Sequence, residues 1–244
     1  MREQPEQQAP PVQRLRIRYA KRGRLRFTSH RDFSRAFERA VFRARIPMAY
    51  SSGFNPHPRI SYAGAAPTGS ASEAEYLEIA LAEVVDPAAV ATQLGEALPP
   101  GLDVLDVVES PGGSLSDRLE ASHWLLDVAA DPAATEAAVA AFLTAESVEV
   151  ERMTKKGMRT FDCRAAVVSL AVVAPEQGDA DAPVRPGLRL DLVLRHGVPS
   201  VRPDDVLSGL RKVAELELGG QVLLTRAAQG PLHDDGTVGD PLSF

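Results

Sequence analysis

The chain has 244 residues, of which 44% are hydrophobic and 25% are charged, which is enough apolar content for one large or two small globular domains. No apolar run reaches the roughly 18 residues of a membrane span and no secretory signal is visible, so we expect a cytoplasmic protein without a membrane partner. The single cysteine, Cys163, excludes an internal disulfide and an iron–sulfur cluster held by several of this chain's own thiolates.

The net charge of −6 conceals a strongly uneven distribution of charge. Fourteen of the 27 Lys and Arg residues lie in the first 60 positions with only four acids, so that stretch carries +10 and the remainder carries −16. Residues 65–150 hold one cation, Arg118, and sixteen acids. A basic surface on an acidic protein is typical of polyanion binding, and a solubilising face is the alternative. The acidic stretch would repel nucleic acid and would equally suit a basic protein partner.

The first predicted element is a strand. Residues 1–11 are rich in Gln, Glu and Pro and predict a disordered tail. Over residues 14–20 cations alternate with apolar residues, and a period of two places Arg16 and Arg18 on the face opposite the apolar set. The same alternation returns at 24–27. We therefore expect Arg16 and Arg18 to be available for contact with RNA phosphates.

A helix over 30–45 is expected next, because Ser29 is followed three residues later by an acid. At 100° per residue its apolar side chains form one stripe. The opposite side carries three arginines and an aromatic residue, namely Arg31, Arg35, Arg39 and Phe42. An aromatic ring among arginines suits a surface that stacks bases and neutralises phosphates. The alternative is that Phe42 packs against another domain or loop.

The loop at 50–58, Tyr-Ser-Ser-Gly-Phe-Asn-Pro-His-Pro, is rich in residues that shape turns. We expect it to be ordered and close to the arginines, with Asn55 and His57 pointing outward toward RNA. Phe54 is expected either to stack on a base or to anchor the loop in the core.

Catalytic chemistry is a weaker interpretation of the same residues. His30, His57 and Tyr50 are candidate acid–base groups for metal-independent RNA cleavage. The alternatives are a capping or phosphate-contacting His30 and a turn histidine at 57. No pair of residues shows metal-ligand spacing, so no metal site is predicted.

The elements of the first half follow the order β-α-β-β-α-β, and those of the second half follow much the same order with a long hairpin. In the first half we expect extended segments at 59–66, 75–81 and 102–108 and a helix at 86–98. In the second half we expect strands at 124–128, 147–153, 160–173, 188–194 and 220–226, helices at 131–143 and 203–216, and a loop at 175–187. The predicted fold class is α+β, with two tandem ferredoxin-like domains at 12–110 and 120–228 and a flexible tail at 229–244.

A second basic cluster lies at the turn of the predicted 147–173 hairpin. Gly157 suits a tight reversal, and Lys155, Lys156 and Arg159 would then project from the tip and grip an RNA backbone. A solvated turn is the alternative.

Several of these strings resemble the radical-SAM-linked protein family, whose domain occurs alone or fused to the C-terminus of a radical SAM enzyme. The resemblance covers about residues 12–220 and rests on four segments: Phe27–Asp32, Arg39-Ala40, Tyr50–Pro58, and Pro67–Gly69 with Glu75-Tyr76. The Gly-Phe-Asn-Pro-His-Pro string is the most specific of them. Arg31 stands where the family usually has an apolar residue, and Ser52 where Gln is common.

The resemblance implies cooperation with a cobalamin- and S-adenosylmethionine-dependent partner that carries its own iron–sulfur cluster, and it suggests a link to RNA metabolism. We expect this chain itself to bind no cofactor.

Two hypotheses about function follow. One is a non-catalytic adaptor that presents an RNA, such as tRNA or rRNA, to a radical SAM modification enzyme. The other is a metal-independent RNA endonuclease on a tandem ferredoxin-like scaffold, an analogy of fold alone.

Overall fold

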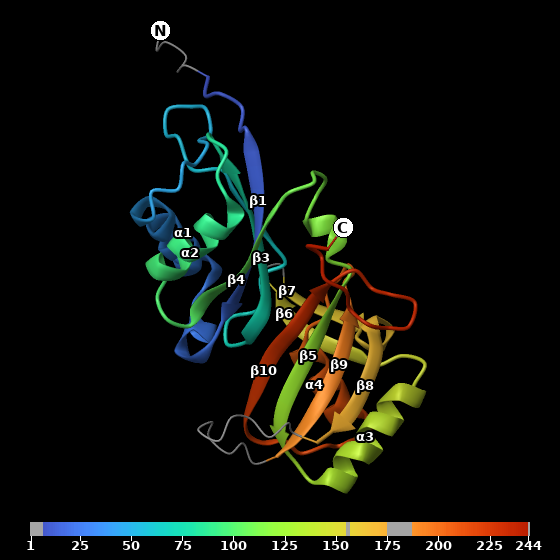
Figure 1. Ribbon diagram of the computed structural model, residues 1–244. Helices are drawn as coiled ribbons and strands as arrows, with labels where there is room; N and C mark the ends of the chain where they lie inside the picture. Colours follow the sequence, from blue (N-terminus) through green and yellow to red (C-terminus); the bar gives the residue numbers. More distant parts are fainter. Residues whose placement is uncertain (1–6, 155–156, 175–186, 244) are drawn as a thin grey trace. The chain divides into compact units, whose positions relative to one another are not determined.

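The computed structural model describes residues 7–154, 157–174 and 187–243 (Figure 1). The chain divides into two compact units. Unit 1 comprises Met1–Arg118 with Pro241–Phe244, and unit 2 comprises Leu119–Asp240. Each unit combines an antiparallel sheet with two α-helices among its described residues, so the predicted α+β class is confirmed.

Among its described residues, unit 1 contains four strands and two α-helices in the order β-α-β-β-α-β. They are β1 (Gln13–Lys21), α1 (His30–Arg43), β2 (Ile60–Ala63), β3 (Ala71–Leu81), α2 (Pro87–Ala97) and β4 (Leu102–Glu109). The strands pair antiparallel in the order β4-β1-β3-β2, which places β1 between two neighbours. Both helices pack on the sheet face that carries Leu15 and Ile17, and the core of the unit lies between them.

Unit 2 contains β5 (Ala121–Ala129), α3 (Pro132–Thr144), β6 (Glu149–Thr154), β7 (Gly157–Asp162), β8 (Val167–Val173), β9 (Leu188–Arg195), α4 (Pro203–Ala214) and β10 (Gly219–Gly230). Its main sheet runs β10-β5-β9-β8 with antiparallel pairs, and β6 and β7 form a separate hairpin. Phe142 of α3 and Leu210 of α4 are fully buried in the core of this unit.

Three expected elements differ in the structure. Residues Gly23–Phe27 form a 3-10 helix rather than a strand. The expected long strand at 160–173 is divided, because one 3-10 turn at Arg164–Ala166 separates β7 from β8. At the C-terminus we expected a flexible tail, but β10 continues to Gly230 and Leu242 is buried. The Ser243 carbonyl accepts a hydrogen bond from Arg118 at 2.6 Å, which holds the described end of the chain to unit 1.

Both ends of α1 are fixed by local hydrogen bonds. The Ser29 hydroxyl accepts from the Asp32 amide at 3.2 Å and donates to the Asp32 carboxylate at 2.7 Å, so the expected N-terminal cap is present. At the other end the Ile46 amide donates to the Val41 carbonyl at 3.2 Å, and the Arg45 amide to Phe42. This is a Schellman arrangement, and its left-handed position, usually glycine, is occupied by Arg45 with φ 55°.

Candidate nucleic-acid interface

The outward face of α1 carries the predicted basic surface. Arg31, Arg35 and Arg39, the arginine row, are all exposed, and Phe42 is 82% exposed. The predicted common face is therefore confirmed, and Phe42 does not pack against another described element. No side chain of the arginine row forms a hydrogen bond or ion pair with any other residue that the structure describes. Their charges are available to a ligand.

The arginines of β1 have a different role from the one predicted. Arg16 is fully buried, so its assignment as an RNA contact is wrong. Arg18 is partly exposed and is engaged with the Glu73 carbonyl at 2.9 Å and the Asp106 carboxylate at 3.6 Å. The alternation in β1 is real, but β3 and β4 supply acids opposite the cations and neutralise them within the sheet.

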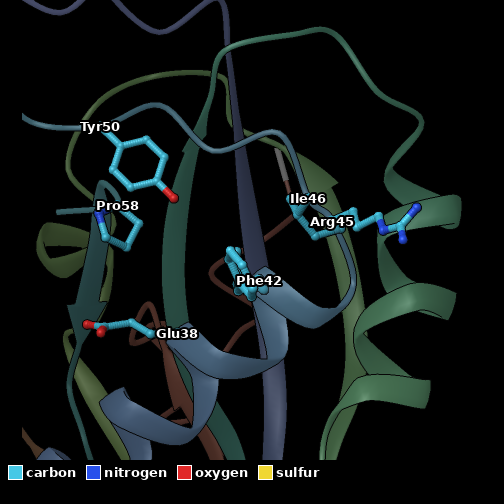
Figure 2. A pocket seen from close by; sticks show the side chains of 7 residues that line it. Glu38, Phe42, Arg45, Ile46, Tyr50 and Pro58 are labelled. Carbon is cyan, nitrogen blue, oxygen red and sulfur yellow. The ribbon is translucent and has the colours of Figure 1, made fainter. Parts of the chain in front are cut away.

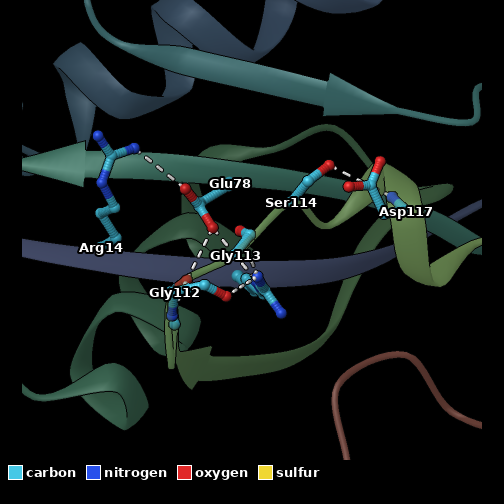
Figure 3. Close-up of polar contacts among 8 residues, drawn as sticks. Arg14, Glu78, Gly112, Gly113, Ser114 and Asp117 are labelled. Atoms are coloured by element: carbon cyan, nitrogen blue, oxygen red, sulfur yellow. Dashed lines mark hydrogen bonds and ion pairs between the residues drawn. The ribbon is translucent and has the colours of Figure 1, made fainter.

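Arg16 is held by a polar network, and Figure 3 shows its partners Glu78, Gly112 and Gly113. Its Nε donates to Glu78 at 3.2 Å, and its Nη2 donates to the carbonyls of Gly112 at 2.7 Å and Gly113 at 3.0 Å. Both glycines have left-handed φ angles, 92° and 68°, a conformation that side chains disfavour. Glu78 also accepts from the Ser110 hydroxyl at 2.8 Å. The network attaches the segment after β4 to the sheet.

A pocket of about 470 Å³ lies beside Phe42, and we call it the Phe42 pocket. Figure 2 shows Phe42 on the last turn of α1, Glu38 one turn earlier, and Tyr50 and Pro58 across from them. The pocket is lined by Glu38, Val41, Phe42, Arg45, Ile46, Tyr50 and Pro58. A second hollow, of about 540 Å³, is lined by Arg35, Glu38, Arg39 and Phe42. Phe42 and Glu38 thus belong to both hollows and connect the arginine row to the loop that begins at Tyr50.

The 50–58 loop is closed at its base by four contacts. The Ser51 amide donates to the His57 carbonyl at 2.9 Å, and the His57 amide donates to the Ser51 hydroxyl at 3.0 Å. Tyr50 and Pro58 form an isolated β-bridge, and the Arg59 Nε donates to the Tyr50 carbonyl at 3.0 Å. The base of the loop lines the Phe42 pocket, so the loop is ordered and close to the arginine face as predicted.

Side chains at the tip of this loop point to solvent. Asn55 and His57 are exposed, as expected. Phe54 is 67% exposed, so it does not anchor the loop in the core and remains available for stacking.

The three candidate acid–base residues are not brought together. His30 begins α1, and its ring meets Tyr62 edge-on at 4.9 Å between centroids. Phe42 lies twelve residues further along the helix, or about 18 Å along its axis. Tyr50 lines the pocket beside Phe42, far from His30. A proton donor and acceptor acting on one bond must both be within hydrogen-bond reach of it, and this separation opposes a shared role for His30 and Tyr50.

Tyr62 was not among the predicted site residues. Burial raises the pKa of the Tyr62 phenol, the nearby Ser34 hydroxyl opposes the shift, and the negative charge of Glu38 adds to it. Only its place in an extended segment was visible in the sequence, because the pairing of β2 with β3 and the approach of α1 are tertiary features.

The β6–β7 hairpin is the second predicted basic site. Arg159 is exposed, whereas Lys155 and Lys156 lie outside the described residues. Arg152 turns inward, where it pairs with Asp205 and donates to the Ser200 carbonyl at 2.9 Å. The hairpin therefore offers fewer free cations among its described residues than the arginine row does.

Metal and thiol chemistry receive little support from the described part of the chain. Within residues 7–154, 157–174 and 187–243, no three His, Cys, Asp or Glu side chains are placed to share a metal ion. Burial raises the pKa of the Cys163 thiol to about 12, so this thiol stays protonated at neutral pH.

Among the residues that the structure describes, no helix has the length and apolar character needed to span a membrane.

One family model matches residues 14–203, from the start of β1 to the start of α4. Its description is "Uncharacterized protein conserved in bacteria (DUF2344)". The chain belongs to the DUF2344 family. No curated protein matches the chain. The DUF2344 match includes α1 and the whole 50–58 loop, so the arginine row and the Phe42 pocket lie within the family domain. Membership brings no ligand or reaction with it, and the function is argued from the geometry of the site.

Proposed function

We propose that this protein is a non-catalytic RNA-binding adaptor that uses the outward face of α1 and the 50–58 loop. One observation carries the proposal: the arginines of this basic region fall into two classes. Those of β1 are engaged by acids and carbonyls of the same unit, whereas the arginine row has no described partner. Unpaired cations in a row attract a polyanion, because phosphate contacts release counterions.

The dimensions of the row suit a nucleic-acid strand. The arginine row extends about 12 Å along the axis of α1, from Arg31 to Arg39. Successive phosphates of one strand of a duplex are separated by about 3.4 Å along the axis of the duplex. The row can therefore contact several phosphates of one strand. Two exposed aromatic residues, Phe42 and Phe54, lie at its end and on the neighbouring loop, where unpaired bases can stack.

The proposed partner is a radical SAM enzyme that acts on the bound RNA, for example in tRNA or rRNA modification or processing. This part of the proposal is supported by the resemblance of the Gly-Phe-Asn-Pro-His-Pro loop to the radical-SAM-linked family. The partner would supply the iron–sulfur cluster, S-adenosylmethionine and cobalamin chemistry. The scaffold we propose is a pair of tandem ferredoxin-like units, supported by the strand orders β4-β1-β3-β2 and β10-β5-β9-β8.

The proposal is tested by measuring the affinity of a labelled single-stranded RNA at several salt concentrations. Arg35 and Arg39 are both replaced by Glu, and the control replaces the exposed Arg195 and Arg211 of unit 2, which gives the same change in net charge. We expect the α1 variant to bind at least tenfold more weakly, with a flatter salt dependence, because each lost phosphate contact lowers the slope by about 0.7. The control variant should bind like the wild type.

Two results would refute this function. Equal weakening by both variants would mean that binding follows net charge rather than the α1 face. Cleavage of the RNA by the purified protein, abolished by His57→Ala, would replace the adaptor with the endonuclease.

A further inference from the structure

Glu38 is out of place on a surface that only neutralises phosphates. It is exposed on α1 between Arg35 and Arg39, and it lines both hollows beside Phe42. It makes no ion pair with either arginine or with any other residue in the described ranges. A free carboxylate repels a phosphate strand, but it accepts hydrogen bonds from the donor groups of a ligand.

The surroundings of Glu38 are suited to a flat, partly apolar group. Phe42 presents an 82% exposed ring, Tyr50 is 40% exposed, and Pro58 completes the wall on the side of Tyr50. In Figure 2 the Tyr50 hydroxyl points toward the middle of the pocket, while the Arg45 guanidinium points away from Tyr50 and Pro58. An aromatic surface with a carboxylate at its edge is the combination that binds the face and the polar edge of a nucleobase.

Arg45 adds an independent sign that this corner is specialised. Its φ of 55° is a left-handed conformation that is unfavourable for an arginine, at a helix end where glycine would be unstrained. Arg45 lines the Phe42 pocket, and its exposed guanidinium is directed outward from it, where it can attract the phosphate backbone of a strand that enters the pocket.

We propose that the Phe42 pocket binds one unpaired RNA base and that Glu38 selects the base by its donor groups. This inference rests on the proposed RNA-binding function and deepens it. Guanine fits best, because its N1–H and exocyclic amino group are two adjacent donors that a carboxylate accepts together. Uracil fits worst, because its single N–H lies between two carbonyl oxygens that the carboxylate repels. Adenine and cytosine, with one amino group beside a ring acceptor, fall between them.

The test uses four single-stranded oligouridine probes that are identical except for G, A, C or U at one central position. For the wild type we expect the G probe to bind about tenfold more tightly than the U probe, the discrimination typical of a good bidentate contact. Glu38→Gln should lose most of that preference and bind the U probe as well as, or better than, the wild type. The matched control, Glu146→Gln, removes an exposed carboxylate of unit 2 and should change nothing.

A second variant separates stacking from base selection. Phe42→Ala should weaken all four probes by about tenfold while keeping their order, because stacking is tolerant of sequence. Equal wild-type affinity for the four probes, or a G preference that survives in Glu38→Gln, would overturn the inference and leave the RNA-binding function standing. If none of the probes binds, the proposed RNA-binding function itself fails.

Discussion

Replacement of Arg16 by methionine tests whether the arginines of β1 serve the fold. Methionine keeps much of the apolar stem of the side chain, so the change removes mainly the guanidinium. The carbonyls of Gly112 and Gly113 then lose their donor, and Glu78, which is 11% exposed, loses a buried cation. Arg14 pairs with the same carboxylate at 3.1 Å but is 47% exposed, so Arg14→Met is the matched control.

The two variants should differ several-fold in their effect on stability. Removal of one member of a buried ion pair typically costs about 3–5 kcal/mol. Glu78 keeps Arg14 and Ser110 as donors, so we expect the lower end, about 3 kcal/mol, for Arg16→Met. The half-exposed Arg14 should contribute less than about 1 kcal/mol.

The aromatic residues allow the two units to be monitored separately. The single tryptophan, Trp124, belongs to unit 2, and all four tyrosines belong to unit 1: Tyr19, Tyr50, Tyr62 and Tyr76. In urea, a tyrosine-detected transition with a slope of about 1.5 kcal/mol/M should move by about 2 M for Arg16→Met. A shift no larger than that of Arg14→Met would refute the assignment of Arg16 to the fold.

Two further predictions concern single residues. Arg45→Gly should stabilise unit 1 by about 1 kcal/mol in urea unfolding, because it relieves the strain of an arginine in the left-handed conformation. The same substitution should weaken RNA binding a few-fold, because it removes a cation. The control Arg43→Gly, at a helical position, should instead destabilise unit 1 by about 1 kcal/mol. Burial and the charge of Arg226 lower the pKa of His196, against an opposing hydrogen bond to Leu119. The unfolded chain therefore takes up this proton first, so stability monitored by Trp124 should fall as pH drops below about 6.5, and His196→Gln should reduce that fall.

Local patterns predicted the elements of the site well. The Ser29 cap and the 100° periodicity placed α1 and its exposed arginines correctly, because both depend on residues within a few positions of one another. The 50–58 loop was also predicted to be ordered, since its two prolines restrict the backbone and its glycine permits the unusual angles of a tight turn. These features need no knowledge of what lies across the sheet.

The errors arose where distant strands decide the outcome. Alternation correctly placed Arg16 on the face of β1 opposite the apolar residues, but it did not reveal which residues cover the face on which Arg16 lies. The partner Glu78 and the segment with Gly112 lie 62 and 96 residues away in sequence. Tyr62 was overlooked for the same reason, since only tertiary packing brings it to His30.

Photo-crosslinking of the wild-type protein to single-stranded RNA, followed by peptide mapping, tests the central claim most directly. Crosslinks should fall on the peptides that contain Phe42, Tyr50 and Phe54, where exposed rings can stack on bases, and they should decline in Arg35→Glu with Arg39→Glu. Crosslinks confined to unit 2, or unaffected by that double substitution, would contradict an RNA-binding face on α1.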